Sequence, residues 1–173
     1  HPNLSKLFEW CDRGEAHMQL PGKTAIITGG SSGIGRAIAL TLAEAGASVG
    51  VGDLKRSPKS AAVPTAEKIR EDGGDAIFRE TDVRDADDCT TLVEATTDQL
   101  GGLDIVVNNA GGFPPEARGK TIADLSADEW ESIIEVNLTG VRNCTSPAVE
   151  SLKESDAGRI INIASKMGVV GHQ

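Results

Sequence analysis

The sequence predicts an α/β fold in which helices cover both faces of a doubly wound parallel sheet. Three observations support this prediction: short apolar runs alternate with stretches of helical period, a glycine-rich turn follows the first run, and a carboxylate ends the second. The chain has 173 residues, which is about one domain. Its content of 39% hydrophobic and 25% charged residues is typical of a globular protein.

Five apolar runs are expected to form strands, and four helical stretches are expected to connect them. The predicted strands cover residues 24–27, 47–51, 76–78, 103–107 and 159–164. The first helix follows from the spacing of Ile34, Ala37, Ile38, Thr41, Leu42 and Ala45, and a short second helix is expected over 66–72. Because connections between parallel strands are right-handed, the helices fall on both faces of the sheet.

The last two helices have recognisable starts. Asp85 is expected to cap the third helix, whose buried face carries Cys89, Leu92, Val93, Thr96 and Leu100. Ser126 and Glu129 form a capping box that begins a long fourth helix. These signals fix where each helix begins.

Charge and cysteine content exclude several classes of function. The 17 basic and 26 acidic residues give a net charge of −9, which makes nucleic acid and anionic membranes poor partners. Cys11, Cys89 and Cys144 are an odd number at wide spacing, so neither a disulfide framework nor a zinc site is indicated. We expect Cys89 and Cys144 to be small buried side chains and the protein to be cytoplasmic.

Residues 1–17 are interpreted as an extension ahead of a domain that covers residues 18–173. The extension is rich in charges and lacks the continuous apolar run of a signal peptide. The spacing of Leu4, Leu7, Phe8 and Cys11 is compatible with a short amphipathic helix.

The glycine-rich turn, residues 29–35, lies between the first strand and the first helix. The start of a helix offers unpaired backbone N–H groups to an anion, and glycines let a pyrophosphate approach the backbone. A tight turn alone could also use these glycines. Asp53 ends the second strand 24 residues after Gly29, which is where a carboxylate would bind an adenosine ribose.

Asp53 is expected to favour NAD over NADP because its charge repels a 2′-phosphate. Lys55 and Arg56 stand nearby and could weaken that preference. The alternative interpretation makes Asp53 an ordinary turn former at the end of a strand.

Asn137 is a polar residue on the apolar stripe of the long helix, which contains Trp130, Ile133, Ile134 and Val141. An amide buried there would require internal hydrogen bonds. It either ties the helix to a loop or bonds a backbone group or water beside a reaction centre, and periodicity does not separate the two.

Five segments together resemble the short-chain dehydrogenase/reductase family, whose fold is of the Rossmann type. They are Thr28–Gly35, Asp82-Val83, Asn108–Gly111, Val136–Leu138 and Arg159–Ser165, and the resemblance runs from about Leu20 to Gln173. It implies a cofactor site made of Gly29, Ser31, Ser32, Gly33, Ile34, Gly35, Asp53, Leu54, Asp82, Val83, Asn109, Ala110 and Gly111. It also implies Ser165 and Asn137 as catalytic residues.

The resemblance implies a mechanism as well. In the family a tyrosine beside a lysine moves the proton while hydride moves to or from the nicotinamide. The serine bonds the substrate oxygen, and the asparagine holds a water. Ser165 and Asn137 match these positions, although a hydroxyl such as that of Ser165 could also simply cap a turn at the end of a strand.

The chain contains no tyrosine. Because it ends eight residues after Ser165, we expect it to be truncated ahead of the family's Tyr-x-x-x-Lys motif and inactive alone. His172 is a poor substitute for the tyrosine. Truncation also predicts that the fifth strand exposes an apolar edge.

The expected function is that of an NAD-dependent oxidoreductase acting on an alcohol/carbonyl pair and forming a homo-oligomer, a dimer or tetramer, when complete. A non-catalytic NAD-binding or regulatory module is the alternative, and a purely structural domain is a third hypothesis.

Overall fold

The computed structural model describes residues 20–58 and 61–165. The predicted extension at 1–17, its amphipathic helix and His172 lie outside the described residues. All five predicted strands are present, and no boundary is shifted by more than two residues. They are β1 (Thr24–Thr28), β2 (Ser48–Asp53), β3 (Ala76–Glu80), β4 (Ile105–Asn108) and β5 (Arg159–Asn162).

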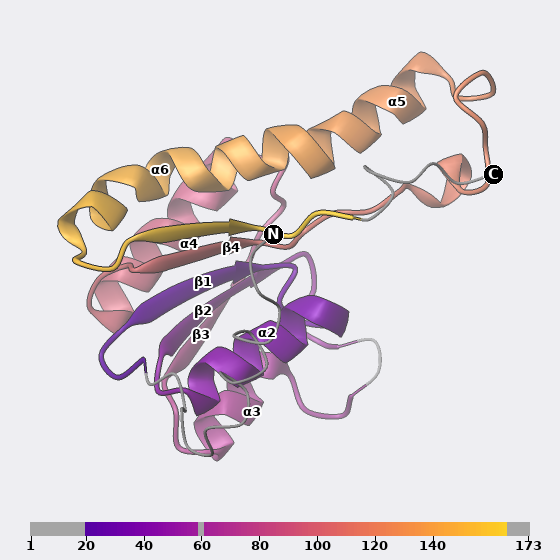
Figure 1. Ribbon diagram of the computed structural model, residues 1–173. Coiled ribbons are helices and arrows are strands. Elements are labelled where there is room, and N and C mark those ends of the chain that lie inside the picture. The colour runs from indigo at the N-terminus through magenta and orange to yellow at the C-terminus, as the bar shows by residue number, and fades with distance from the viewer. Residues whose placement is uncertain (1–19, 59–60, 166–173) are drawn as a thin grey trace, which may run out of the picture.

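The strands form one parallel sheet in the order β3-β2-β1-β4-β5. Helices α2 (Gly33–Glu44) and α3 (Thr65–Glu71) pack on one face, and α4 (Ala86–Leu100) and α6 (Gly140–Glu154) pack on the other (Figure 1). The predicted doubly wound architecture is therefore confirmed. The strand order reverses between β1 and β4, and ligands of such sheets bind at the carboxyl ends of the strands near this point.

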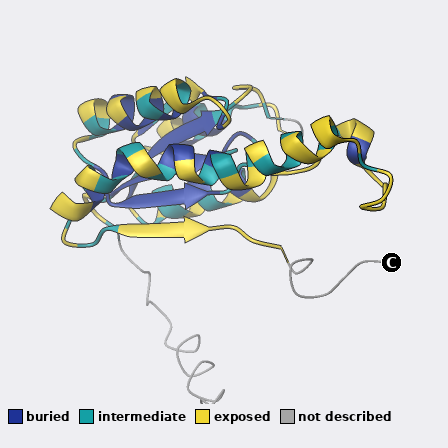
Figure 2. Ribbon diagram, turned by 90° about the horizontal axis from the view of Figure 1, so that it is seen from above, coloured by how far each residue is buried: buried dark blue, intermediate teal, exposed yellow. Residues whose placement is uncertain are grey.

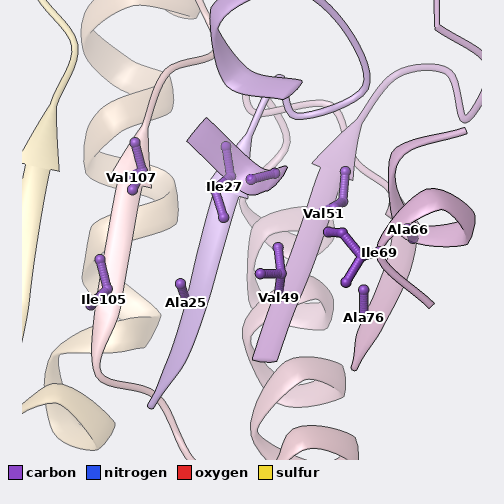
Figure 3. Close-up of a cluster of buried hydrophobic side chains, with 10 residues drawn as sticks. Ala25, Ile27, Val49, Val51, Ala66, Ile69, Ala76, Ile105 and Val107 are labelled. Atoms are coloured by element: carbon purple, nitrogen blue, oxygen red, sulfur yellow. The ribbon is translucent and has the colours of Figure 1, made fainter. Parts of the chain in front are cut away.

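The central strands are buried on both faces because helices cover both sides of the sheet. All five residues of β1 are buried, as expected for a parallel strand at the centre of an α/β fold. Ala25 and Ile27 belong to the cluster beneath α2 and α3 (Figure 3), whereas Ile26 belongs to the cluster beneath α4 and α6.

The predicted inner face of helix α2 is confirmed in part, because Ile38 and Leu42 are half-buried and pack against the core. Ile34 was expected on its inner face but is 66% exposed, and Ala37 and Thr41 are also exposed. The buried positions are Gly35 and Ala39. The reason is that a glycine lets the helix approach the backbone of the preceding turn closely, so position 35 rather than 34 faces inward.

Both predicted helix starts are confirmed. The Asp85 side chain accepts hydrogen bonds from the backbone N–H groups of Asp87 and Asp88 at the start of α4. The capping box is formed in both directions between Ser126 and Glu129 at the start of α5 (Ala127–Ile134).

The long helix after Ser126 contains a π-helical segment, η2 (Glu135–Thr139), between α5 and α6. The N–H of Gly140 donates to the carbonyl of Glu135, five residues earlier. The expectation that the apolar stripe is buried is wrong for Trp130, which is 46% exposed, and for Asn137, which is also exposed. Ile133, Ile134 and Val141 of the same stripe are half-buried. Periodicity identified side chains that share a face, but the described residues leave much of that face uncovered (Figure 2).

Strand β5 is an edge strand, and all four of its residues are exposed (Figure 2). Ile160 and Ile161 are 44% and 45% exposed. The predicted apolar edge is thus present in the described part of the chain. The same part contains no helix long and apolar enough to cross a membrane.

Candidate functional site

A cavity of about 460 Å³ lies at the carboxyl ends of the strands, at the reversal of strand order. Its size falls within the range of small-molecule sites. Residues from β2, from the turn after β1 and from the segments after β3 and β4 line it, together with residues of α5 and η2. Seven predicted site residues are among them: Gly29, Asp53, Leu54, Asp82, Val83, Ala110 and Gly111.

The glycine-rich turn enters α2 without side-chain capping. Ser32 is the N-cap, but its side chain makes no capping hydrogen bond within the described chain. The first turn of α2, which the structure describes in full, contains no acidic residue. The first N–H groups of α2 are therefore not satisfied by a local carboxylate and form a potential anion site.

The glycines of the turn have different roles. Gly29 and Gly33 adopt the left-handed region, with φ of 65° and 56°. No described atom lies within 4 Å of where a Cβ on Gly33 would be, so the approach to this backbone is open. A Cβ on Gly35, by contrast, would lie 2.2 Å from the Gly29 carbonyl oxygen and 2.4 Å from Asn109 Nδ2. Gly33 therefore leaves room for a ligand, and Gly35 allows the helix to pack.

Asp53 ends β2, as predicted, and its carboxylate contacts the glycine-rich turn. Its Oδ2 accepts a hydrogen bond from the Ser31 N–H at 3.0 Å, and its Oδ1 accepts one from the Lys55 N–H at 3.4 Å. The carboxylate therefore organises the local turns, as the alternative interpretation expected, and also lines the cavity. The Ser31 hydroxyl is buried and has no partner among the described residues.

Thr28 joins the glycine-rich turn to the segment after β4. Its hydroxyl donates to the Val107 carbonyl and accepts from the N–H groups of Asn109 and Ala110 at 3.1 and 3.0 Å. In return, Asn109 Nδ2 donates to the carbonyls of Thr28 and Gly29. The two motifs thus form one rigid unit across β1 and β4.

Asp82 and Val83 form the wall of the cavity after β3. The Arg84 side chain forms an ion pair with Asp82, and this hydrogen bonding lowers the pKa of the Asp82 carboxyl despite its partial burial. Val83 packs against Cys89 and Cys144, whose sulfur atoms lie 2.9 Å apart. Both cysteines are buried, as predicted, and they support this wall from behind.

Asn137 ties the π-helical segment to the loop after β4. Its Nδ2 donates to the carbonyls of Gly112 and Ile133, both at 2.8 Å, and its Oδ1 accepts from the Gly112 N–H at 3.0 Å. Gly111 lies so near that a Cβ there would be 2.8 Å from Oδ1. The predicted hydrogen bonding is therefore present, although the residue is exposed rather than buried.

The two predicted catalytic residues lie outside the cavity lining. Ser165 is exposed and follows the end of β5 by three residues, while Asn137 contacts the loop that follows β4. Since β4 and β5 are adjacent, both residues lie on the carboxyl side of the same pair of strands. Six further predicted cofactor residues do not line the cavity: Ser31, Ser32, Gly33, Ile34 and Gly35, which belong to the glycine-rich turn, and Asn109, which contacts it.

Sequence reasoning missed several residues of the cavity wall. Arg84 lies two residues after the predicted Asp82, and Gly112 to Pro115 directly follow the Asn108–Gly111 motif. Ser132 and Val136 come from α5 and η2. The sequence did carry one signal for these residues: a large apolar side chain, Phe113, is followed by two prolines in a loop next to a predicted site.

Comparisons with known proteins agree with this arrangement. A family described as short chain dehydrogenase matches residues 23–173. The chain is 38% identical over 150 residues to the 3-oxoacyl-[acyl-carrier-protein] reductase FabG of Staphylococcus aureus, covering 87% of this chain and 58% of the relative. It is 36% identical over 158 residues to cis-4-hydroxycyclohexanecarboxylate dehydrogenase of Sinomonas cyclohexanicum, covering 91% of this chain and 59% of the relative.

Solved structures show the same similarity. The crystal structure of a short-chain alcohol dehydrogenase, described as putative, from Sinorhizobium meliloti aligns with a TM-score of 0.79 at 35% identity. This alignment covers 90% of the present chain and 59% of that one. The chain thus spans somewhat under two thirds of the length of these relatives. The described fold, the linked motifs and these matches establish that the chain belongs to the short-chain dehydrogenase/reductase family.

Proposed function

We propose that this chain is the cofactor-binding part of an NAD-dependent oxidoreductase that interconverts an alcohol and a carbonyl compound. The observation that supports this most strongly is the position of Asp53, whose carboxylate contacts the Ser31 N–H and also lines the cavity. One group thereby connects the turn expected to bind phosphate with the pocket expected to bind adenosine.

The residues present fit a dinucleotide. The buried Ser31 hydroxyl lacks a partner among the described residues, and such a group calls for a ligand or a water. The open backbone at Gly33 and the N–H groups of α2 would hold the pyrophosphate. Val83 and Leu54 would contact the adenosine, and Asn109 to Gly111 would line the nicotinamide side. The cofactor supplies a hydride acceptor or donor when bound.

Asp53 is proposed to select NAD. A carboxylate at this position accepts hydrogen bonds from both ribose hydroxyls, and its charge repels a 2′-phosphate. The nearest basic residues on the chain are Lys55, whose backbone N–H donates to Asp53 Oδ1, and Arg56, whose guanidinium donates to Glu67.

Ser165 is proposed to donate a hydrogen bond to the substrate oxygen, where negative charge develops during the reaction. Asn137 has used both of its N–H donors on the protein, but its Oδ1 has a further lone pair that could accept from a water. The chain contains no tyrosine, and we propose that the proton donor of the whole protein lies outside these 173 residues.

The substrate class rests on the relatives. One is named as a reductase of a 3-oxoacyl group, which is a carbonyl compound. The other is named as a dehydrogenase of a hydroxycyclohexanecarboxylate, which is an alcohol. These names favour an enzyme over a non-catalytic binding module. A homo-oligomer in the cytoplasm, and a domain that begins near residue 18, remain further proposals.

Calorimetric titration of the complete protein with NAD and NADP tests the cofactor choice. Asp53→Asn keeps an acceptor for the Ser31 N–H, so it removes the charge while preserving the turn. We expect Asp53→Asn to raise the dissociation constant for NAD by about tenfold and to reduce the difference in affinity between NAD and NADP. Glu80→Gln is the matched control, because Glu80 is in register with Asp53 at the end of the neighbouring strand β3. A wild type that already prefers NADP would contradict the proposal.

A further inference from the structure

Arg56 is a basic side chain close to the proposed ribose site, yet it is not among the described residues that line the cavity. It follows Asp53 by three residues, so their Cα atoms lie at most about 10 Å apart. An arginine at such a place can bind the 2′-phosphate of NADP. Its position therefore bears on which cofactor the protein accepts.

Two contacts hold the Arg56 guanidinium against β3 and α3. Its Nε donates to Glu67 Oε1 at 2.7 Å, and its Nη2 donates to the same oxygen. The guanidinium also lies over the ring of Phe78, 5.7 Å from the ring centre. An aromatic face and a carboxylate together fix an otherwise flexible side chain that remains 54% exposed.

Glu67, which accepts these hydrogen bonds from Arg56, lies on α3. Its carboxylate is partly buried, with 26% of the side chain exposed, and Arg70 Nη2 approaches Oε1 at 3.4 Å. Arg70 is itself anchored, because its Nη1 donates to the Ala76 carbonyl at 2.6 Å. Burial is the largest single influence on the pKa of Glu67 and raises it, but the hydrogen bonds to Arg56 and to a backbone N–H, together with the charges of Arg56 and Arg70, lower the pKa by more. The group is therefore ionised at neutral pH.

We propose that Glu67 is a specificity-determining residue that holds Arg56 away from the ribose site and so prevents it from binding a 2′-phosphate. This inference rests on the proposed function, because it assumes that adenosine binds beside Asp53. Glu67 would then be a second residue, besides Asp53, that determines the preference for NAD over NADP. Asp53 repels the extra phosphate directly, whereas Glu67 withholds the cation that would attract it.

Removing the charge of Glu67 should release Arg56. In Glu67→Gln the two guanidinium groups of Arg56 and Arg70 would share one neutral oxygen and repel each other. Arg70 keeps its bond to Ala76, so Arg56 is the one expected to move. The released side chain then becomes available to a phosphate on the 2′-oxygen, as a charge-assisted contact.

The test compares two small probes that differ in the 2′-phosphate, 5′-AMP and adenosine 2′,5′-bisphosphate, by calorimetry on the complete protein. The readout is the ratio of the two dissociation constants, bisphosphate over AMP. We expect Glu67→Gln to lower this ratio by about fivefold at low salt, and less at high salt, with AMP binding unchanged. Glu71→Gln, an exposed position on the same helix, is the matched control and should leave the ratio unchanged.

The double variant Arg56→Gln/Glu67→Gln should restore the wild-type ratio, which assigns the gain to Arg56. An unchanged ratio in Glu67→Gln, or a lowered ratio that persists in the double variant, would overturn the inference while leaving the proposed function intact. A higher ratio in Arg56→Gln alone would also overturn it, since Arg56 would then already reach the phosphate. Failure of AMP to bind the wild type would instead overturn the proposed function, and this inference with it.

Discussion

Replacing Gly35 with alanine tests whether the first helix needs its close approach to the glycine-rich turn. The added Cβ would lie 2.2 Å from the Gly29 carbonyl oxygen and 2.4 Å from Asn109 Nδ2, so the backbone or the amide must move. Overpacking of this kind costs about 1–3 kcal/mol. Displacing Asn109 also breaks its two hydrogen bonds to the carbonyls of Thr28 and Gly29, at about 1 kcal/mol each.

Alanine is the better helix former, which offsets about 1 kcal/mol of this cost. The net loss for Gly35→Ala is therefore expected to be about 2–4 kcal/mol in the free energy of unfolding. Urea denaturation of the complete protein measures it, with the midpoint and slope analysed together.

Gly33→Ala is the matched control, two residues away in the same turn. No described atom lies within 4 Å of the added Cβ, so only the strain of a φ of 56° remains, about 1 kcal/mol. Gly33→Ala should therefore reduce nucleotide affinity with only a small loss of unfolding free energy. Gly35→Ala should lose more unfolding free energy than Gly33→Ala does. A Gly35→Ala protein within about 0.5 kcal/mol of the wild type would refute this reasoning.

Two further perturbations follow from particular side chains. Asn137→Ala removes three hydrogen bonds to Gly112 and Ile133 and should cost about 1–2 kcal/mol, with faster amide hydrogen exchange at Gly112; an unchanged exchange rate would contradict this. For Asp104, burial is the largest single influence and raises the pKa, but the hydrogen bonds from Ser155, the Thr24 N–H and Lys23, with the charge of Lys23, together lower it by more. The folded pKa therefore lies below the ordinary value of 3.8. The ionised Asp104 carboxylate therefore stabilises the folded protein above pH 3.8, and this contribution is lost as the pH falls through the folded pKa. The unfolding free energies of the wild type and Asp104→Asn should then approach each other below about pH 4. A difference that stays constant down to about pH 2 would contradict this.

The fold was predictable because its signals are local. The caps at Asp85 and Ser126 depend on residues two and three positions away, and both were confirmed. Packing against distant segments is less accessible to sequence. Ile34 was wrongly placed on the inner face of α2, because the close packing at Gly35 involves Asn109, more than 70 residues away.

The candidate site was predictable where a motif follows a strand directly. Asp53 and Asp82 line the cavity because parallel strands bring their carboxyl ends to one edge. Phe113 was missed because its place depends on the path of an irregular loop. Asn137 was expected to be buried, since spacing identifies a shared helix face without specifying what covers it.

A crystal structure of the complete protein with NAD bound would test the central claim most directly. We expect the pyrophosphate to accept hydrogen bonds from the backbone N–H groups at the start of α2, beside Gly33, and the adenosine ribose to donate to the Asp53 carboxylate. A dinucleotide bound elsewhere on the molecule, or a ribose without contact to Asp53, would contradict the account.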